Sequence, residues 1–116
     1  MSKSVKALLQ HIGQSSQIAL AYMKDVSKAR FLEDVGLQDK VIRRLAIIGE
    51  AVKGLPEEFR ARHPAIAWKD IAGMRDILVH EYYDVNTLLV WRVVKKQVPK
   101  LLNYVVRAIA IADMEE

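Results

Sequence analysis

The sequence has no cysteine, no Asn-Gly or Asp-Gly pair, and no clean alternation of apolar and polar residues. The absence of cysteine excludes disulfides and thiolate metal sites, and it suits a reducing cytosol. The missing hairpin dipeptides and the missing alternation argue against β-strands. No uncharged apolar run approaches the roughly 18 residues of a membrane span, and the N-terminal segment has no apolar signal core. We therefore expect a helical, cytoplasmic protein without membrane association.

The overall composition predicts a single compact domain. The chain has 116 residues, of which 52% are hydrophobic, and its formal net charge is +4. This length suits one domain, and the hydrophobic fraction is ample for a core. Because no repeat, linker or low-complexity tract interrupts the sequence, we predict one domain over residues 1–116. The mild positive excess favours polyanionic partners but is too small to establish nucleic-acid binding.

Apolar residues recur every three or four positions, which is the spacing of amphipathic helices. The pattern predicts helices over residues 4–24 and 38–54, a short helix within residues 56–62, and a helix that begins near Trp68 and frays near residues 83–84. The expected fold is an all-α antiparallel bundle of four to five main helices.

Three places along the chain are expected to interrupt this pattern. Between residues 25 and 36, Phe31 and Leu32 are expected to hold a short turn or helical piece against the core, and Gly36 to break it. The last main helix is expected to begin near residues 84–86. Pro99 is expected to kink or split that helix, because proline lacks the backbone N–H that a helix interior needs.

The stretch Arg75-Asp-Ile-Leu-Val-His80-Glu-Tyr82 is the main candidate for chemistry. Arginine presents a planar fork that fits phosphate oxygens and keeps its charge. Histidine gives or takes a proton near pH 7. Together these two side chains are the minimum equipment for breaking a phosphodiester bond without a metal.

Helix geometry constrains how these residues can act together. At about 100° per residue, His80 lies roughly 140° around a helix from Arg75, whereas Tyr82 returns to within about 20°. For Arg75 and His80 to hold one phosphate, either the helix ends or distorts before His80, or two copies of the helix meet. We favour a two-fold homodimer, which would place two such motifs near its axis.

The segment Trp68-Lys-Asp-Ile-Ala-Gly-Met-Arg75-Asp-Ile-Leu-Val-His80-Glu-Tyr82-Tyr83 resembles the HepT-like branch (DUF86) of the HEPN superfamily. The segment Val41-Ile-Arg-Arg-Leu-Ala-Ile-Ile-Gly-Glu50-Ala is similar to the second hallmark of that branch. Trp91 and the later Leu-rich helix with Pro99 also fit. The resemblance covers nearly the whole chain, and the Arg-x4-His-x-Tyr motif is specific to the group.

This resemblance implies a HEPN-like helical homodimer that acts as a metal-independent endoribonuclease toxin and needs no cofactor. The site would lie in the cleft between protomers, with Arg75 and His80 catalytic and Tyr82 contacting the RNA. The implied partner is a minimal nucleotidyltransferase antitoxin of a type VII toxin–antitoxin system. That partner would inactivate the toxin by attaching AMP to Tyr82. The chain would form a homodimer, alone or within a larger hetero-oligomer with the antitoxin.

Two acids are candidates for supporting roles around Arg75. Asp76 stands where many members of the resembled family carry Asn, and an acid there is expected to pair with Arg75 and weaken its hold on phosphate. Glu50 is expected either to orient Arg75 or a catalytic water, or to have a solvated or structural role. Two non-enzymatic alternatives stay open: a non-catalytic module that presents a nucleotide or protein substrate to the transferase, and a purely structural dimer.

Overall fold

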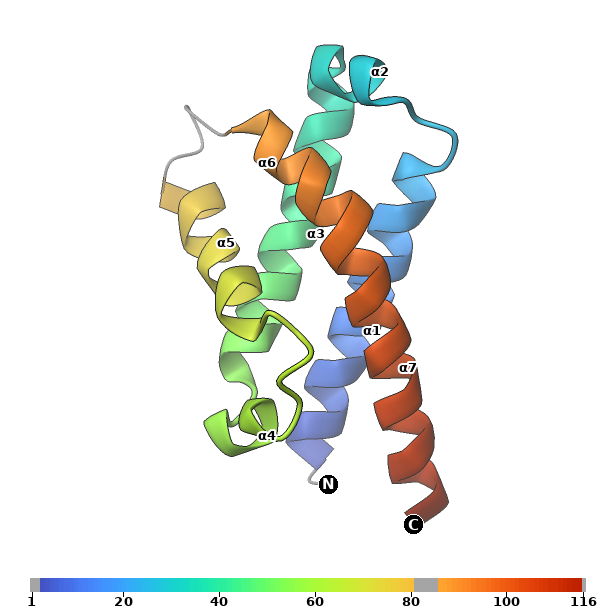
Figure 1. The fold of residues 1–116 in the computed structure, drawn as a ribbon, viewed down its shortest axis with the longest axis vertical. Coiled ribbons are helices and arrows are strands. Elements are labelled where there is room, and N and C mark those ends of the chain that lie inside the picture. Colours follow the sequence, from blue (N-terminus) through green and yellow to red (C-terminus); the bar gives the residue numbers. More distant parts are fainter. Residues whose placement is uncertain (1–2, 81–85, 116) are drawn as a thin grey trace.

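The computed structural model describes residues 3–80 and 86–115, and every regular element in these ranges is helical (Figure 1). The elements are α1 (Lys3–Met23), α2 (Lys28–Glu33), α3 (Val35–Gly54), α4 (Glu57–Ala61), α5 (Trp68–His80), α6 (Thr87–Arg92), the π-helical segment η2 (Val93–Gln97) and α7 (Val98–Glu115). This confirms the predicted all-α class. None of the described helices is long and apolar enough to cross a membrane.

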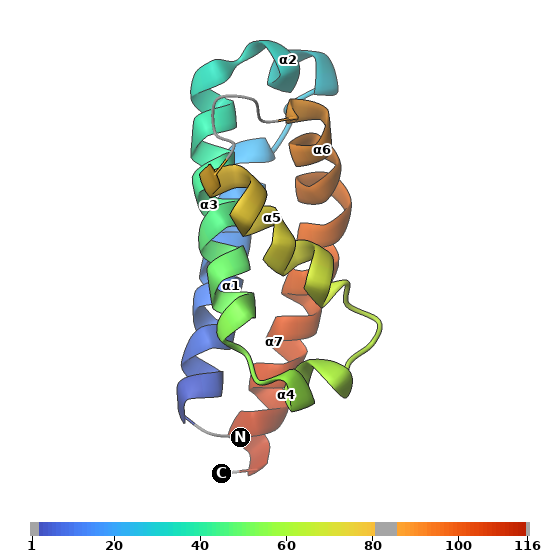
Figure 2. The ribbon, with the colours of Figure 1, turned by 90° about the vertical axis from the view of Figure 1, so that its left-hand side faces the viewer.

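The main helices alternate in direction, so the bundle is antiparallel. α1, α3 and α5 follow one another up and down the long axis, and α6, η2 and α7 together return along it (Figure 1). α3 lies between α1 and α5, and Figure 2 shows α5 crossing the face of α3. The core between these helices includes Leu9, Val41, Ile48, Leu101 and Val105, each at most 1% exposed.

The segment between α1 and α3 differs in part from the expectation. Phe31 is fully buried, as predicted, and it holds α2 against the core. Leu32 is 39% exposed, so its predicted packing role is wrong. Gly36 does not break a helix either, because it lies inside α3. The boundary falls at Asp34, whose extended backbone ends α2 and whose side chain accepts a hydrogen bond from the Leu37 N–H at 3.0 Å. An aspartate at the N-cap compensates the unpaired N–H groups of the new helix.

The helix is not split at Pro99, because α6, η2 and α7 follow one another without a break, but its type changes just upstream. The segment η2 (Val93–Gln97) is π-helical, and the Val98 N–H donates to the Val93 carbonyl. Because proline has no N–H to donate, the ladder upstream must adjust its pairing, and a π-turn is one way to do so. The helix that contains these residues begins after Asn86, within the expected range, and the Asn86 side chain accepts from the Leu89 N–H at 3.1 Å.

The start of α5 is fixed by a tryptophan anchor. Trp68 is 6% exposed, and its Nε1–H donates to the His63 carbonyl at 2.9 Å. Further along the helix, Ile71, Met74 and Leu78 are buried in the core. The fold therefore holds the segment that contains Arg75 as a packed helix and not as a loop. The predicted fraying near residues 83–84 lies outside the described residues.

Candidate functional site

The contact between α3 and α5 is closest at Gly49. A Cβ atom placed on Gly49 would lie 2.7 Å from the Cβ of Arg75 and 3.0 Å from the carbonyl oxygen of Ile71. Only a residue without a side chain fits at such a distance, so glycine lets the two helix backbones approach. Arg75 therefore projects from α5 at the point where α5 crosses α3.

Glu50, the next residue of α3, contacts the guanidinium group of Arg75. The Nε of Arg75 lies 2.9 Å from Oε2 of Glu50. The Arg75 side chain is 30% exposed and that of Glu50 is 64% exposed, so the pair lies at the surface. An exposed pair of this kind contributes little to stability. The contact is compatible with the orienting role predicted for Glu50, and the exposure of its side chain is compatible with the alternative solvated role.

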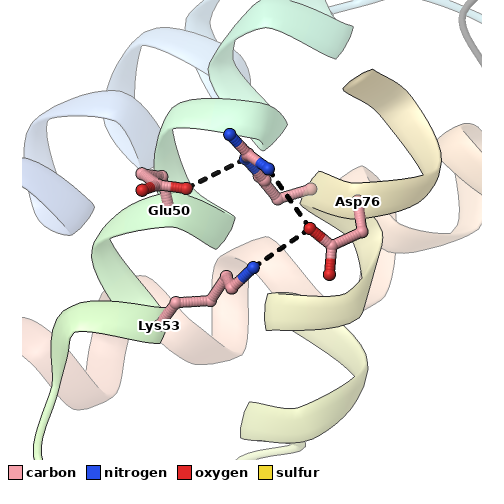
Figure 3. A network of polar contacts seen from close by, with 4 residues as sticks. Glu50, Lys53 and Asp76 are labelled. Atoms are coloured by element: carbon pink, nitrogen blue, oxygen red, sulfur yellow. Dashed lines mark hydrogen bonds and ion pairs between the residues drawn. The ribbon is translucent and has the colours of Figure 1, made fainter. Parts of the chain in front are cut away.

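Asp76 forms the second contact of Arg75, at 3.3 Å from Nη1 to Oδ1. The same carboxylate oxygen also accepts a hydrogen bond from Nζ of Lys53 at 3.0 Å (Figure 3). The hydrogen bonds from Lys53 and then Arg75 lower the pKa of Asp76 below its ordinary value of 3.8. Asp76 is therefore ionised at neutral pH and is shared between two cations.

The site is thus a surface network of four charged side chains from two helices. Glu50 and Lys53 come from α3, Asp76 comes from α5, and Arg75 joins them (Figure 3). Arginine has further N–H donors beyond the two used here. Among residues 3–80 and 86–115, those further donors form no hydrogen bond or ion pair.

Three of the five predicted site residues are brought together by this network: Arg75, Asp76 and Glu50. Lys53 was not predicted, although it follows Glu50 by three residues and so shares its helix face. The Tyr82 prediction and the side chain of His80 lie outside the described residues. The backbone of α5 is helical through His80, so the helix does not end or distort before that position. The sequence offered two ways for Arg75 and His80 to hold one phosphate: a helix that ends or distorts before His80, or two copies of the helix that meet. The continuous helix is compatible only with the second.

Within the described residues, no group of three or more His, Asp or Glu side chains is placed to hold a metal ion. The network around Arg75 contains two carboxylates and two cations. The two cations can attract an anionic ligand, and the two carboxylates offset their positive charge.

Comparison with known proteins assigns the chain to one family. The family model described as "Ribonuclease HepT-like" matches residues 8–108, which include both helices of the site. The chain therefore belongs to the ribonuclease HepT-like family, as the resemblance of the motif predicted. No solved structure gives a significant match.

Named relatives extend this comparison. A Methanocaldococcus jannaschii protein named "Gamma-glutamylcyclotransferase and putative RNase" is 45% identical over 97% of this chain, which spans 51% of that protein. A Caldanaerobacter subterraneus protein named "Putative RNase" is 43% identical over 85% of this chain and 88% of its own length. The "Probable ribonuclease HepT" of Thermococcus cleftensis is 38% identical over 87% of this chain and 92% of its own.

Proposed function

We propose that this chain is an endoribonuclease that cleaves RNA without a metal, using Arg75 and His80. The observation that carries the proposal is the guanidinium of Arg75, which Glu50 orients at 2.9 Å on a partly exposed surface between α3 and α5. A fixed, partly hydrated guanidinium is suited to neutralise a phosphate. Membership of the ribonuclease HepT-like family supports the choice of RNA as substrate.

The proposed reaction uses the substrate's own nucleophile. The ribose 2′-oxygen forms a bond to the adjacent phosphorus while the bond from phosphorus to the 5′-oxygen breaks, which leaves a 2′,3′-cyclic phosphate and a 5′-hydroxyl. His80 takes the proton of the 2′-OH, and the same imidazolium or a water molecule then gives a proton to the leaving 5′-oxygen, so one copy of His80 suffices for each site. Arg75 would neutralise the charge that grows on the non-bridging oxygens.

Glu50 and Asp76 then have different supporting roles. Glu50 contacts Nε, so it can stay in place while the N–H groups of the Nη nitrogens donate to a phosphate. Asp76 contacts Nη1 at 3.3 Å, so it competes directly with a phosphate for the same donor. The competition is lessened because Lys53 also holds the Asp76 carboxylate.

The same proposal includes regulation by a partner. A minimal nucleotidyltransferase antitoxin would transfer AMP to the hydroxyl of Tyr82, with pyrophosphate leaving from ATP. The added phosphate would be an anion bound near Arg75, and the adenosine would occupy space that RNA needs. The chain would then be the toxin of a toxin–antitoxin pair, and its working state would be a homodimer, alone or within a larger complex with the antitoxin.

One observation favours a second, non-catalytic function. Both acids beside Arg75 already occupy guanidinium donors, which weakens its attraction for a phosphate. A chain that only presented a nucleotide or protein substrate to the transferase would not need a free guanidinium. That alternative expects RNA or nucleotide to be bound without being cut.

The test is cleavage of a labelled RNA by the purified protein in EDTA, compared with Arg75→Ala and His80→Ala. We expect cleavage to persist in EDTA and to fall by about a hundredfold or more in each variant, because each removes a group acting in the transition state. Arg107→Ala, at an exposed arginine of α7, is the matched control and should cleave normally. DNA of the same sequence should resist because it has no 2′-OH. Loss of cleavage in EDTA, or full activity in either motif variant, would contradict the mechanism.

A further inference from the structure

The charge of the Arg75 network raises the question of where RNA is attracted. The network contains two carboxylates and two cations, so its formal net charge is zero. The whole chain carries +4. The positive excess therefore lies elsewhere on the molecule, and a polyanion would be drawn first to that other surface.

A groove of about 600 Å³ between α5 and the α6–η2 segment is such a surface. Its apolar lining includes Ile71 and Met74 from α5 and Leu89 and Val93 from the opposite wall. This volume lies within the usual range of ligand sites. Because Ile71 and Met74 are almost fully buried and Leu89 and Val93 are partly exposed, a nucleobase would lie mainly against the α6–η2 wall.

Three cations and one acid surround the apolar lining. Lys69 comes from α5, Arg92 from α6 and Lys96 from η2, and the acid is Asp70. All three cations are exposed, and among the described residues none of them forms an ion pair with a carboxylate. Cations from both walls beside an apolar strip match the alternating phosphates and bases of a single strand.

The path of the groove relates it to the catalytic motif. Gly73 lines the α5 wall, and a Cβ atom there would meet nothing within 4 Å, so a strand can approach the helix closely. Lys69, Gly73 and position 80 are separated by four and then seven residues of one helix, which places them on the same face of α5. A strand that follows the groove along α5 is therefore led toward position 80, about 10 Å beyond Gly73 along the helix axis.

We propose that this groove, lined by Lys69, Arg92 and Lys96, binds a single-stranded segment of RNA that flanks the cleavage point. The proposal rests on the ribonuclease function for its choice of RNA, and it adds a binding surface outside the Arg75 network. The groove would hold the strand through phosphates and bases, while the chemistry takes place at the motif.

The binding test uses the full chain and a 2′-O-methyl RNA, which cannot be cleaved by its own 2′-oxygen. Affinity is measured at several salt concentrations for the wild type, Lys69→Ala, Lys96→Ala and the double variant. Each lost phosphate contact should reduce the slope of log K against log salt by about 0.7 and weaken binding about three- to tenfold at low salt. Lys24→Ala, at an exposed lysine in the turn after α1, is the control and should match the wild type.

Cleavage of ordinary RNA is the second arm, and it separates this proposal from the ribonuclease function. If binding depends on the groove lysines but no RNA is cleaved, the RNA-binding role of the groove is supported and the ribonuclease function is contradicted. If the wild type cleaves RNA and both lysine variants bind it unchanged, the ribonuclease function is supported and the role of the groove is contradicted. A change of oligomeric state in the groove variants, measured by sedimentation, would also overturn the proposal, because the groove would then be an interface between copies of the chain. Failure of the wild type to bind RNA would reject both.

Discussion

At the scale of single residues, Lys53 decides how strongly Asp76 competes for Arg75. Its Nζ lies 3.0 Å from the carboxylate oxygen that Arg75 contacts at 3.3 Å. Lys53 and Arg75 both contact Oδ1 of Asp76, so without Lys53 this carboxylate would interact with Arg75 only. The guanidinium would then be less available to a phosphate. Lys53 is in this sense a positioning residue that acts through Asp76.

Lys53→Ala is therefore expected to raise the KM for RNA about two- to fivefold with little change in kcat, since it alters an exposed electrostatic balance. Asp76→Asn should lower KM. The double variant Lys53→Ala, Asp76→Asn should behave like Asp76→Asn alone, and Lys53→Arg should resemble the wild type. Steady-state cleavage kinetics measure all four. If Lys53→Ala were equally harmful in the Asp76→Asn background, Lys53 would contact RNA directly.

The sequence predicted part of this site, and the reason is visible in its residues. Arg75 and Asp76 are adjacent, so their pairing was predictable, and the contact is present. Glu50 is distant along the chain from Arg75, so the sequence alone left their contact undecided. The contact forms because α5 packs against α3. Lys53 was missed because its partner lies on another helix, although its spacing from Glu50 placed it on the same face.

At the scale of elements, the sequence predicted the long helices better than their boundaries. The apolar spacing that predicted residues 4–24 and 38–54 corresponds to α1 and α3. Gly36 was taken as a breaker on its intrinsic preference, yet a helix tolerates glycine when a neighbour caps it, as Asp34 does. The π-helical turn upstream of Pro99 depends on which backbone carbonyls accept hydrogen bonds from which N–H groups. The spacing of apolar residues does not predict these pairings.

The two helical glycines, Gly49 and Gly73, test the contact between α3 and α5. Gly49→Ala places a methyl group 2.7 Å from the Cβ of Arg75, so the helices must separate. We expect a loss of about 1–3 kcal/mol in the free energy of unfolding, as for other overpacked sites. Gly73→Ala meets open space and should stabilise α5 by about 0.5–1 kcal/mol through helix propensity. Urea unfolding of both variants measures the difference, and equal stability of Gly49→Ala and wild type would contradict a tight crossing.

At the scale of the whole molecule, the helix geometry bears on assembly. α5 is helical through His80, so positions 75 and 80 are about 140° apart on one helix. A single protomer therefore directs these two positions toward different sides of α5. This is the physical reason to expect that one active site combines Arg75 of one protomer with His80 of its partner. The sequence could propose such a dimer but could not identify its interface, because nothing in helical spacing distinguishes a core face from a face that meets another copy.

Mixing two inactive variants tests this shared site. In a heterodimer of Arg75→Ala and His80→Ala, one site loses both groups and the other keeps both. After subunit exchange, random pairing gives heterodimers in half of the population, so about one quarter of the wild-type activity should return. The control mixes Arg75→Ala with the double variant Arg75→Ala, His80→Ala, whose heterodimers have no complete site and should stay inactive. If heterodimers form, as native mass spectrometry can establish, and no activity returns in the first mixture, then each site is built within one protomer and α5 must rearrange when RNA binds.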